Sequence, residues 1–421
     1  MDSLKEYLLN IRGSYTNGYF EIYLEGDFNL NLSLLTSTDL GTFFHEYIHF
    51  LQNITTLWGI KIGIMRNNIL CSFLNSIKKD EEIHIPYKFE CDPITKQELD
   101  YYKLTRGSDG NDKLKSRIIN TADILSIYID PDNSQKWPVP LNKVYVKLHF
   151  SDGREDHIQL GANIVVESMA ALCQSFIDPD AQHNDVPYNF VQILANKYFP
   201  KIAIDKKKLI CLCYISMFSM NPGWELINMM KYAEVNIDKS GIELFDEFIN
   251  DTKLIVNGKK VSVIEFFDQI IDGYKRSIKG LIGEELDYLD VVLNNVRLSN
   301  NKAPIINILN DPEPIGISHI NALIQHLSIP YILIPSKDKY FYPGTINSNK
   351  GSSDIAFMVG FSRIFDFFTN PKESFKNICP FVNMCEHDHD YCYNAPWKET
   401  NCTIVPLLKR IGVYGKPIIY D

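Results

Sequence analysis

Hydrophobic and polar residues first follow a regular pattern at residues 19–25, where apolar and polar side chains alternate. Such alternation is typical of a half-buried β-strand, and we predict a strand there. The chain then becomes mostly apolar after Thr36, with Asp39 three residues further on in a capping-box pattern that begins a helix. We therefore predict a helix from about residue 37 to about residue 60, with helical structure continuing to residue 78.

A second region of alternation covers residues 144–160, where two alternating runs flank an Asp-Gly pair. This arrangement is a strong signal for a β-hairpin. Directly after it, residues 161–176 carry apolar side chains at helical spacing and predict a mostly buried helix, with Glu167 in its middle. Charged and turn-forming residues at about 79–140 indicate a loop-rich insertion.

From residue 189 onward most segments have helical patterns, including a long one near 262–298, and residues 331–336 form a candidate strand. A chain of 421 residues exceeds the usual size of a single core, which favours more than one domain. We therefore predict an α+β fold that is mainly α-helical. Its expected parts are a catalytic-type domain with a small β-sheet at 1–188, a helical domain at 189–370 and a cysteine-rich segment at 371–421.

Composition and charge restrict the classes of partner. The chain is 45% hydrophobic and 22% charged, as in an ordinary globular protein, and its net charge of -10 offers no basic surface for phosphate contacts. Its longest apolar run, residues 209–220, is shorter than the roughly 20 residues that cross a bilayer. The N-terminus has no signal-peptide pattern. We therefore expect a cytoplasmic protein that binds neither nucleic acid nor membrane.

The predicted helix at 37–60 contains His45, Glu46 and His49. Side chains four residues apart lie on one side of a helix, so the two imidazoles can bind one ion. Glu46 stands beside them, where a carboxylate can take a proton from a metal-bound water. Zinc suits such ligands and keeps a position open for water. The surrounding residues are apolar nearly all round, so the group is expected to be buried and to need the partners that a metal supplies.

On these residues the chain resembles the zincins, the zinc metallopeptidases whose helix carries HExxH. The metzincin branch continues as HExxHxxGxxH, whereas here Gln52 and Thr55 replace the glycine and the last histidine, which excludes that branch. The gluzincin branch takes a glutamate from a second helix, and Glu167 is similar to that ligand because a carboxylate inside an apolar helix needs a partner. The alternatives that stay open for the third ligand are Glu81, Glu82, Glu90 and His84.

This resemblance implies a zincin-like catalytic domain that hydrolyses peptide bonds in a peptide or protein substrate. It implies a catalytic Zn²⁺ held by His45, His49 and Glu167, with Glu46 activating a water. It also implies a hydrogen-bond donor for the oxyanion. The candidates for that donor are His183, Tyr188 and His319.

Zincins bind their substrate as an added strand along a sheet edge. By analogy, the strand at 19–25 or the hairpin at 144–160 can provide such an edge here. A catalytically inactive zincin-like regulatory or binding protein is an alternative to the peptidase.

Four of the nine cysteines gather near the C-terminus, at Cys379, Cys385, Cys392 and Cys402. This density of soft ligands favours a second, structural Zn²⁺. No CxxC pair is present, so free thiols, a disulfide or an iron-sulfur cluster stay open, and with them the function of a metal or thiol sensor. The other five cysteines lie in apolar or mixed segments, which predicts buried free thiols.

Overall fold

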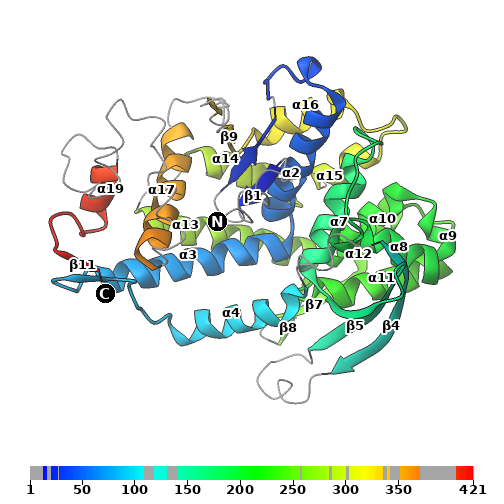
Figure 1. Ribbon diagram of the computed structural model, residues 1–421, viewed down its shortest axis with the longest axis horizontal. Coiled ribbons are helices and arrows are strands. Elements are labelled where there is room, and N and C mark those ends of the chain that lie inside the picture. Colours follow the sequence, from blue (N-terminus) through cyan, green and yellow to red (C-terminus); the bar gives the residue numbers. More distant parts are fainter. Residues whose placement is uncertain are drawn as a thin grey trace.

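A computed structural model describes most of the chain. The described residues are 13–16, 20–26, 28–108, 118–129, 141–256, 258–283, 287–299, 303–334, 339–341, 351–369 and 404–420. Helices make up most of this structure and the sheets are small (Figure 1), so the fold is α+β and mainly α-helical, as the sequence predicts. Cys379, Cys385, Cys392 and Cys402 lie outside the described residues.

The predicted helix around His45 begins where its capping pattern places it. Helix α2 spans Ser37–Thr55, and the side chain of Thr36 accepts a hydrogen bond from the backbone N–H of Asp39. The expected continuous helix is in fact two helices, because Thr56 adopts extended backbone angles (φ -120°, ψ 152°). The Thr56 side chain then caps α3, Leu57–Ile77, by accepting from the N–H of Gly59.

The second predicted helix is α7, Ala162–Gln174, which packs against α2 (Figure 1). Gly41 of α2 permits a close approach, since a Cβ at that position would lie 2.8 Å from the Cβ of Asp178, just beyond the end of α7. The packing of these two helices determines which side chains from α7 face His45 and His49.

A four-stranded sheet lies beside α2, with strand order β1-β2-β9-β10. Its strands are β1 Gly13–Thr16, β2 Glu21–Leu24, β9 Tyr331–Ile334 and β10 Lys339–Phe341. The strands predicted at 19–25 and 331–336 are both confirmed, and they pair with each other in parallel. Because β2 is paired on both sides, it offers no free edge for a substrate. The hydroxyl of Tyr47 on α2 donates to the carbonyl of Ser328, 2.8 Å away, and holds the helix against the turn before β9.

The predicted hairpin is confirmed as β5, Asn142–Phe150, and β6, Glu155–Leu160. The expectation of a loop-rich insertion before it is only partly right, because this region also contains β3 Ile83–Ile85, α4 Pro93–Arg106 and β4 Ile119–Ile129. Strand β4 pairs with β5 to give an antiparallel sheet of order β4-β5-β6. A strand is stabilised by the neighbour with which it pairs, and local composition does not reveal that neighbour.

The part of the chain after residue 189 is mainly helical, as predicted. Its helices are α8 Phe190–Tyr198, α9 Pro200–Ala203, α10 Lys206–Ser216, α11 Pro222–Val235, α12 Gly241–Asp251, α13 Val263–Ile282, α14 Asp287–Asn295, α15 Pro304–Leu309, α16 Ile317–Leu327, α17 Gly351–Thr369 and α19 Ile404–Arg410. The long helix expected near 262–298 is divided, because Gly283 ends α13 with a left-handed φ of 83°. A short hairpin, β7 Lys253–Val256 and β8 Lys259–Ser262, also interrupts the helices, and β11 Ile418–Tyr420 pairs in parallel with β3.

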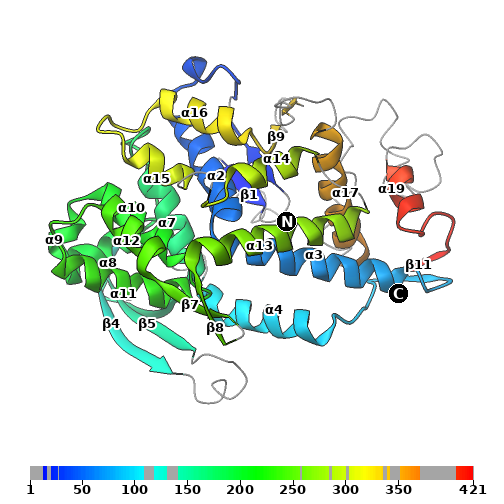
Figure 2. The same ribbon diagram turned by 180° about the vertical axis from the view of Figure 1, so that it is seen from behind.

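One large hydrophobic core connects both halves of the chain, drawing buried residues from Phe20 to Val413. Helix α3 lies along α13, as Figure 2 shows from behind, and α7 packs on α10. The five described cysteines are free thiols, as predicted; the predicted burial is right for Cys173, Cys211 and Cys213, whereas Cys71 and Cys91 are only partly buried. None of the described helices has the length and apolar character needed to cross a membrane.

Candidate metal centre

Helix α2 brings His45 and His49 together, because they stand about one turn apart on the same face. Both are buried, with 6% and 8% of their surface exposed, and their ring centroids lie 4.9 Å apart. Glu46, between them in the sequence, is 6% exposed. Two imidazoles and a carboxylate thus lie in the protein interior, where polar groups need partners.

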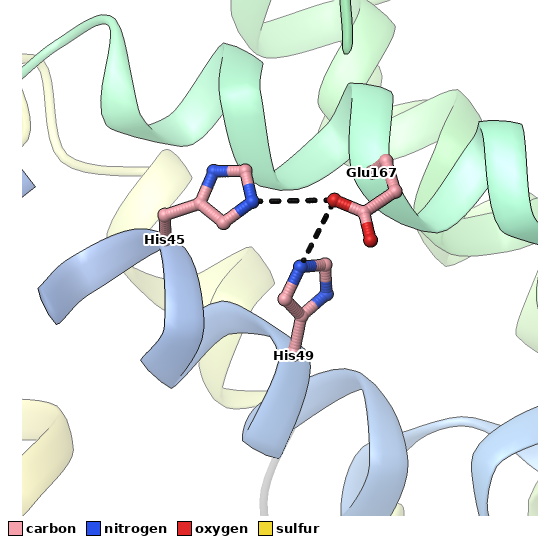
Figure 3. Close-up of side chains that lie close together, drawn as sticks. All are labelled: His45, His49 and Glu167. Atoms are coloured by element: carbon pink, nitrogen blue, oxygen red, sulfur yellow. Dashed lines mark hydrogen bonds and ion pairs between the residues drawn. The ribbon is translucent and has the colours of Figure 1, made fainter. Parts of the chain in front are cut away.

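Glu167 of α7 reaches this group from the opposite side (Figure 3). Its Oε2 atom lies 3.3 Å from Nε2 of His45 and 3.3 Å from Nε2 of His49. Tetrahedral zinc with bonds of about 2.0–2.1 Å places neighbouring ligand atoms about 3.3–3.4 Å apart, which matches both distances. Among the residues that the structure describes, these three side chains form the one cluster of potential metal ligands whose ligand atoms lie within 4.8 Å of one another.

The protonation of this cluster favours a positive charge at its centre. Nδ1 of His49 lies 2.9 Å from the amide oxygen of Gln52, so that nitrogen carries a proton and donates it. In neutral His49 the Nε2 lone pair would then face the carboxylate oxygen of Glu167, and the two lone pairs would repel. A proton or a metal ion between them removes this repulsion. The chemistry of the donor set therefore fits a divalent metal such as zinc.

The pKa values of His49 and Glu167 also favour a positive charge between these two side chains. Burial acts to lower the pKa of His49, but Glu167, with smaller contributions from Glu46 and Gln52, more than offsets burial and raises that pKa to about 9. Burial likewise acts to raise the pKa of Glu167, but His49 and His45 hold it well below its usual range. Without a metal, a proton shared with His49 supplies the positive charge, and a bound metal must displace that proton.

Glu46 is not one of the three clustered ligand candidates, although its carboxyl group lies near them. Burial raises the pKa of its carboxyl group, although the neighbouring His45 and His49 oppose this effect. Its carboxylate lies against strand β1, where a Cβ on Gly13 would stand 2.9 Å from both Cγ and Oε1 of Glu46. Gly13 therefore leaves the space in which the Glu46 carboxylate sits.

Two of the three candidate oxyanion donors lie close to His45. After α7 the chain forms a π-helical turn at Asp185–Asn189, and the rings of His183 and Tyr188 stand 5.8 and 5.7 Å from the ring of His45. Nε2 of His183 donates to the amide oxygen of Gln174 at 2.9 Å. Burial, with a contribution from His45, lowers the pKa of His183 to about 4. Neutral His183 therefore already uses its single N–H in this hydrogen bond.

His319 and the alternative third ligands lie elsewhere. Nδ1 of His319 accepts from the backbone N–H of Gly316, and Nε2 lies 3.3 Å from Asp311, so the ring is engaged at the start of α16. The alternative ligands are all exposed and do not belong to the described cluster: Glu81, Glu82, Glu90 and His84.

Sequence reasoning missed the role of Gln52. We used this residue to exclude a metzincin pattern, whereas in the structure it is the hydrogen-bond partner of His49. Its position three residues after His49 on one helix is the signal that could have indicated the contact, since such residues are neighbours on the helix surface.

In comparisons with known proteins, no family model, no curated protein and no solved structure matches this chain.

Proposed function

We propose that this protein is a metal-dependent hydrolase that cleaves peptide bonds, with Zn²⁺ held by His45, His49 and Glu167. One observation carries the proposal: the Nε2 atoms of His45 and His49 each lie 3.3 Å from the same carboxylate oxygen of Glu167, and Glu46 is buried beside them. Zinc held there would polarise a substrate carbonyl and make water more acidic.

Glu46 accepts the proton of the attacking water in this proposal. It is not among the three clustered ligands, yet its carboxyl group is close enough to His45, His49 and Glu167 to interact with them electrostatically. Burial raises the pKa of the Glu46 carboxyl group toward neutral pH. A pKa in that direction helps the group both to accept the proton of the water and to pass it to the leaving amine.

Two further elements complete the proposed site. Tyr188, whose ring stands 5.7 Å from that of His45, donates to the oxyanion. Strand β1 lies at the edge of its sheet in the described structure, and its Gly13 is in contact with Glu46. A peptide that adds to this edge as a further strand would lie beside Gly13, the β1 residue that contacts the proposed base.

The test compares wild-type protein with Glu46→Gln, which keeps the size of the side chain and removes the base. We expect both to hold equal amounts of zinc by elemental analysis, and the variant to lose roughly 10²-fold or more of its hydrolysis of a peptide library read by mass spectrometry. Glu225→Gln, at a carboxyl group of α11 whose pKa burial also raises, is the matched control and retains activity.

Three results would contradict the proposal. Wild-type protein that binds no divalent metal removes its premise. Glu46→Gln protein that keeps both its metal and full hydrolysis shows that another group is the base. Metal binding without any hydrolysis in the wild type favours the inactive, binding-protein alternative.

A further inference from the structure

Gln52 lies buried between the two helices that carry the proposed ligands, with 3% of its surface exposed. Its amide oxygen is 2.9 Å from Nδ1 of His49, and its amide nitrogen is 3.0 Å from the carbonyl oxygen of Val166 on α7. One side chain thus contacts a proposed ligand on α2 and the backbone next to the proposed ligand on α7.

These two contacts determine the protonation form of His49. The Val166 carbonyl can only accept, so the NH₂ end of the Gln52 amide must face it and the oxygen end must face His49. An amide oxygen can also only accept, so His49 must carry a proton on Nδ1. The nitrogen that faces Glu167 is then Nε2, which is the atom left for a metal.

We infer that Gln52 is a positioning residue for the metal: it holds His49 in its metal-binding form and ties it to the helix of Glu167. This inference rests on the proposed metal site. An amide suits the position because it accepts on one side and donates on the other. A carboxylate would accept from His49 but would place a second acceptor against the carbonyl of Val166.

The two proposed histidine ligands differ in whether their Nδ1 atom has a hydrogen-bond partner. Nδ1 of His45 is buried and has no hydrogen-bond partner within the described part of the chain. The ring of His49 is therefore held at both nitrogens, whereas the ring of His45 is held at Nε2. Loss of the Gln52 amide removes the partner of Nδ1 from the one proposed histidine ligand that has such a partner in the described structure, so we expect a clear loss of metal affinity.

The test uses Gln52→Met, which keeps the length of the side chain and loses both hydrogen bonds. Zinc affinity is measured by competition with a chromophoric chelator, and the tautomer of neutral His49 by ¹⁵N NMR of the metal-free protein at a pH above the His49 pKa of about 9. We expect zinc to bind about 10- to 100-fold more weakly and His49 to lose its single Nδ1–H form.

Two further variants separate positioning from general packing. Gln174→Met makes the same change at another buried glutamine, whose partner His183 is not a proposed ligand, and zinc affinity is expected to stay unchanged. Gln52→Glu keeps an acceptor for His49, so the Nδ1–H form is expected to persist even though the bond to Val166 is lost. The melting temperature of each metal-free variant reports its folding.

The outcomes are distinguishable. If Gln52→Met lowers the melting temperature but leaves zinc affinity and the His49 tautomer unchanged, Gln52 is merely structural and the inference is overturned while the metal site stands. If the wild-type protein binds no zinc, the proposed function fails, and this inference fails with it.

Discussion

Replacing Glu167 by glutamine removes a negative charge from the candidate metal centre while keeping the size of the side chain. In the metal-free protein the Glu167 carboxylate lies 3.3 Å from Nε2 of His49 and, together with Glu46 and Gln52 and against the effect of burial, raises the His49 pKa from 6.5 to about 9. That difference corresponds to about 3 kcal/mol in favour of the protonated imidazole. Once the charge of Glu167 is lost, burial is opposed only by the smaller contributions of Glu46 and Gln52, and we expect the His49 pKa to fall below 6.5.

This change can be measured by NMR titration of the histidine Cε1–H signals in metal-free protein, with His49→Ala identifying the signal. The wild-type signal should titrate near pH 9 and the Glu167→Gln signal below 6.5. Because the folded-state pKa is raised, the stabilisation from protonated His49 is complete below pH 6.5 and is lost as the pH rises through about 9. The wild-type melting temperature should therefore fall across that window, and the variant should lack this contribution. A Glu167→Gln protein in which His49 still titrates near 9 would refute the reasoning.

Three further predictions follow from the same structure. Zinc must displace the His49 proton, so its apparent affinity should rise about tenfold per pH unit between 7 and 9, and a pH-independent competition titration would contradict this. Gly13→Ala would place a Cβ 2.9 Å from Oε1 of Glu46, so hydrolysis should fall about 10²-fold at unchanged zinc content, with Ser14→Ala as the control. Tyr274→Phe removes a buried hydroxyl that has no hydrogen-bond partner among the described residues, and it should raise stability by about 1 kcal/mol in denaturant unfolding, whereas a decrease would argue that the hydroxyl is paired.

Local features of this protein could be predicted from the sequence because they depend on neighbours in the chain. Thr36 and Asp39 determine where α2 begins, and helical spacing alone puts His45 and His49 on one face. The alternating residues at 144–160 and the turn between them were sufficient to predict the β5-β6 hairpin.

Features that depend on distant partners could not be predicted in this way. The break at Thr56 is accompanied by a hydrogen bond from the N–H of Trp58 to the carbonyl of Met217, far along the chain. Strand β4 depends on pairing with β5, and β2 on pairing with β9. Composition near a segment carries no information about such partners.

The candidate site likewise combines features that are local in the sequence with contacts between distant residues. The sequence by itself places His45, Glu46 and His49 on one buried helix, because a helical repeat and an apolar surround are local properties. Only the packing of α7 on α2 brings the Glu167 carboxylate within 3.3 Å of both imidazoles and gives the Gln52 amide a carbonyl to bind. Those contacts join residues more than a hundred positions apart, so they exist only once the core has formed and the two helices lie against each other.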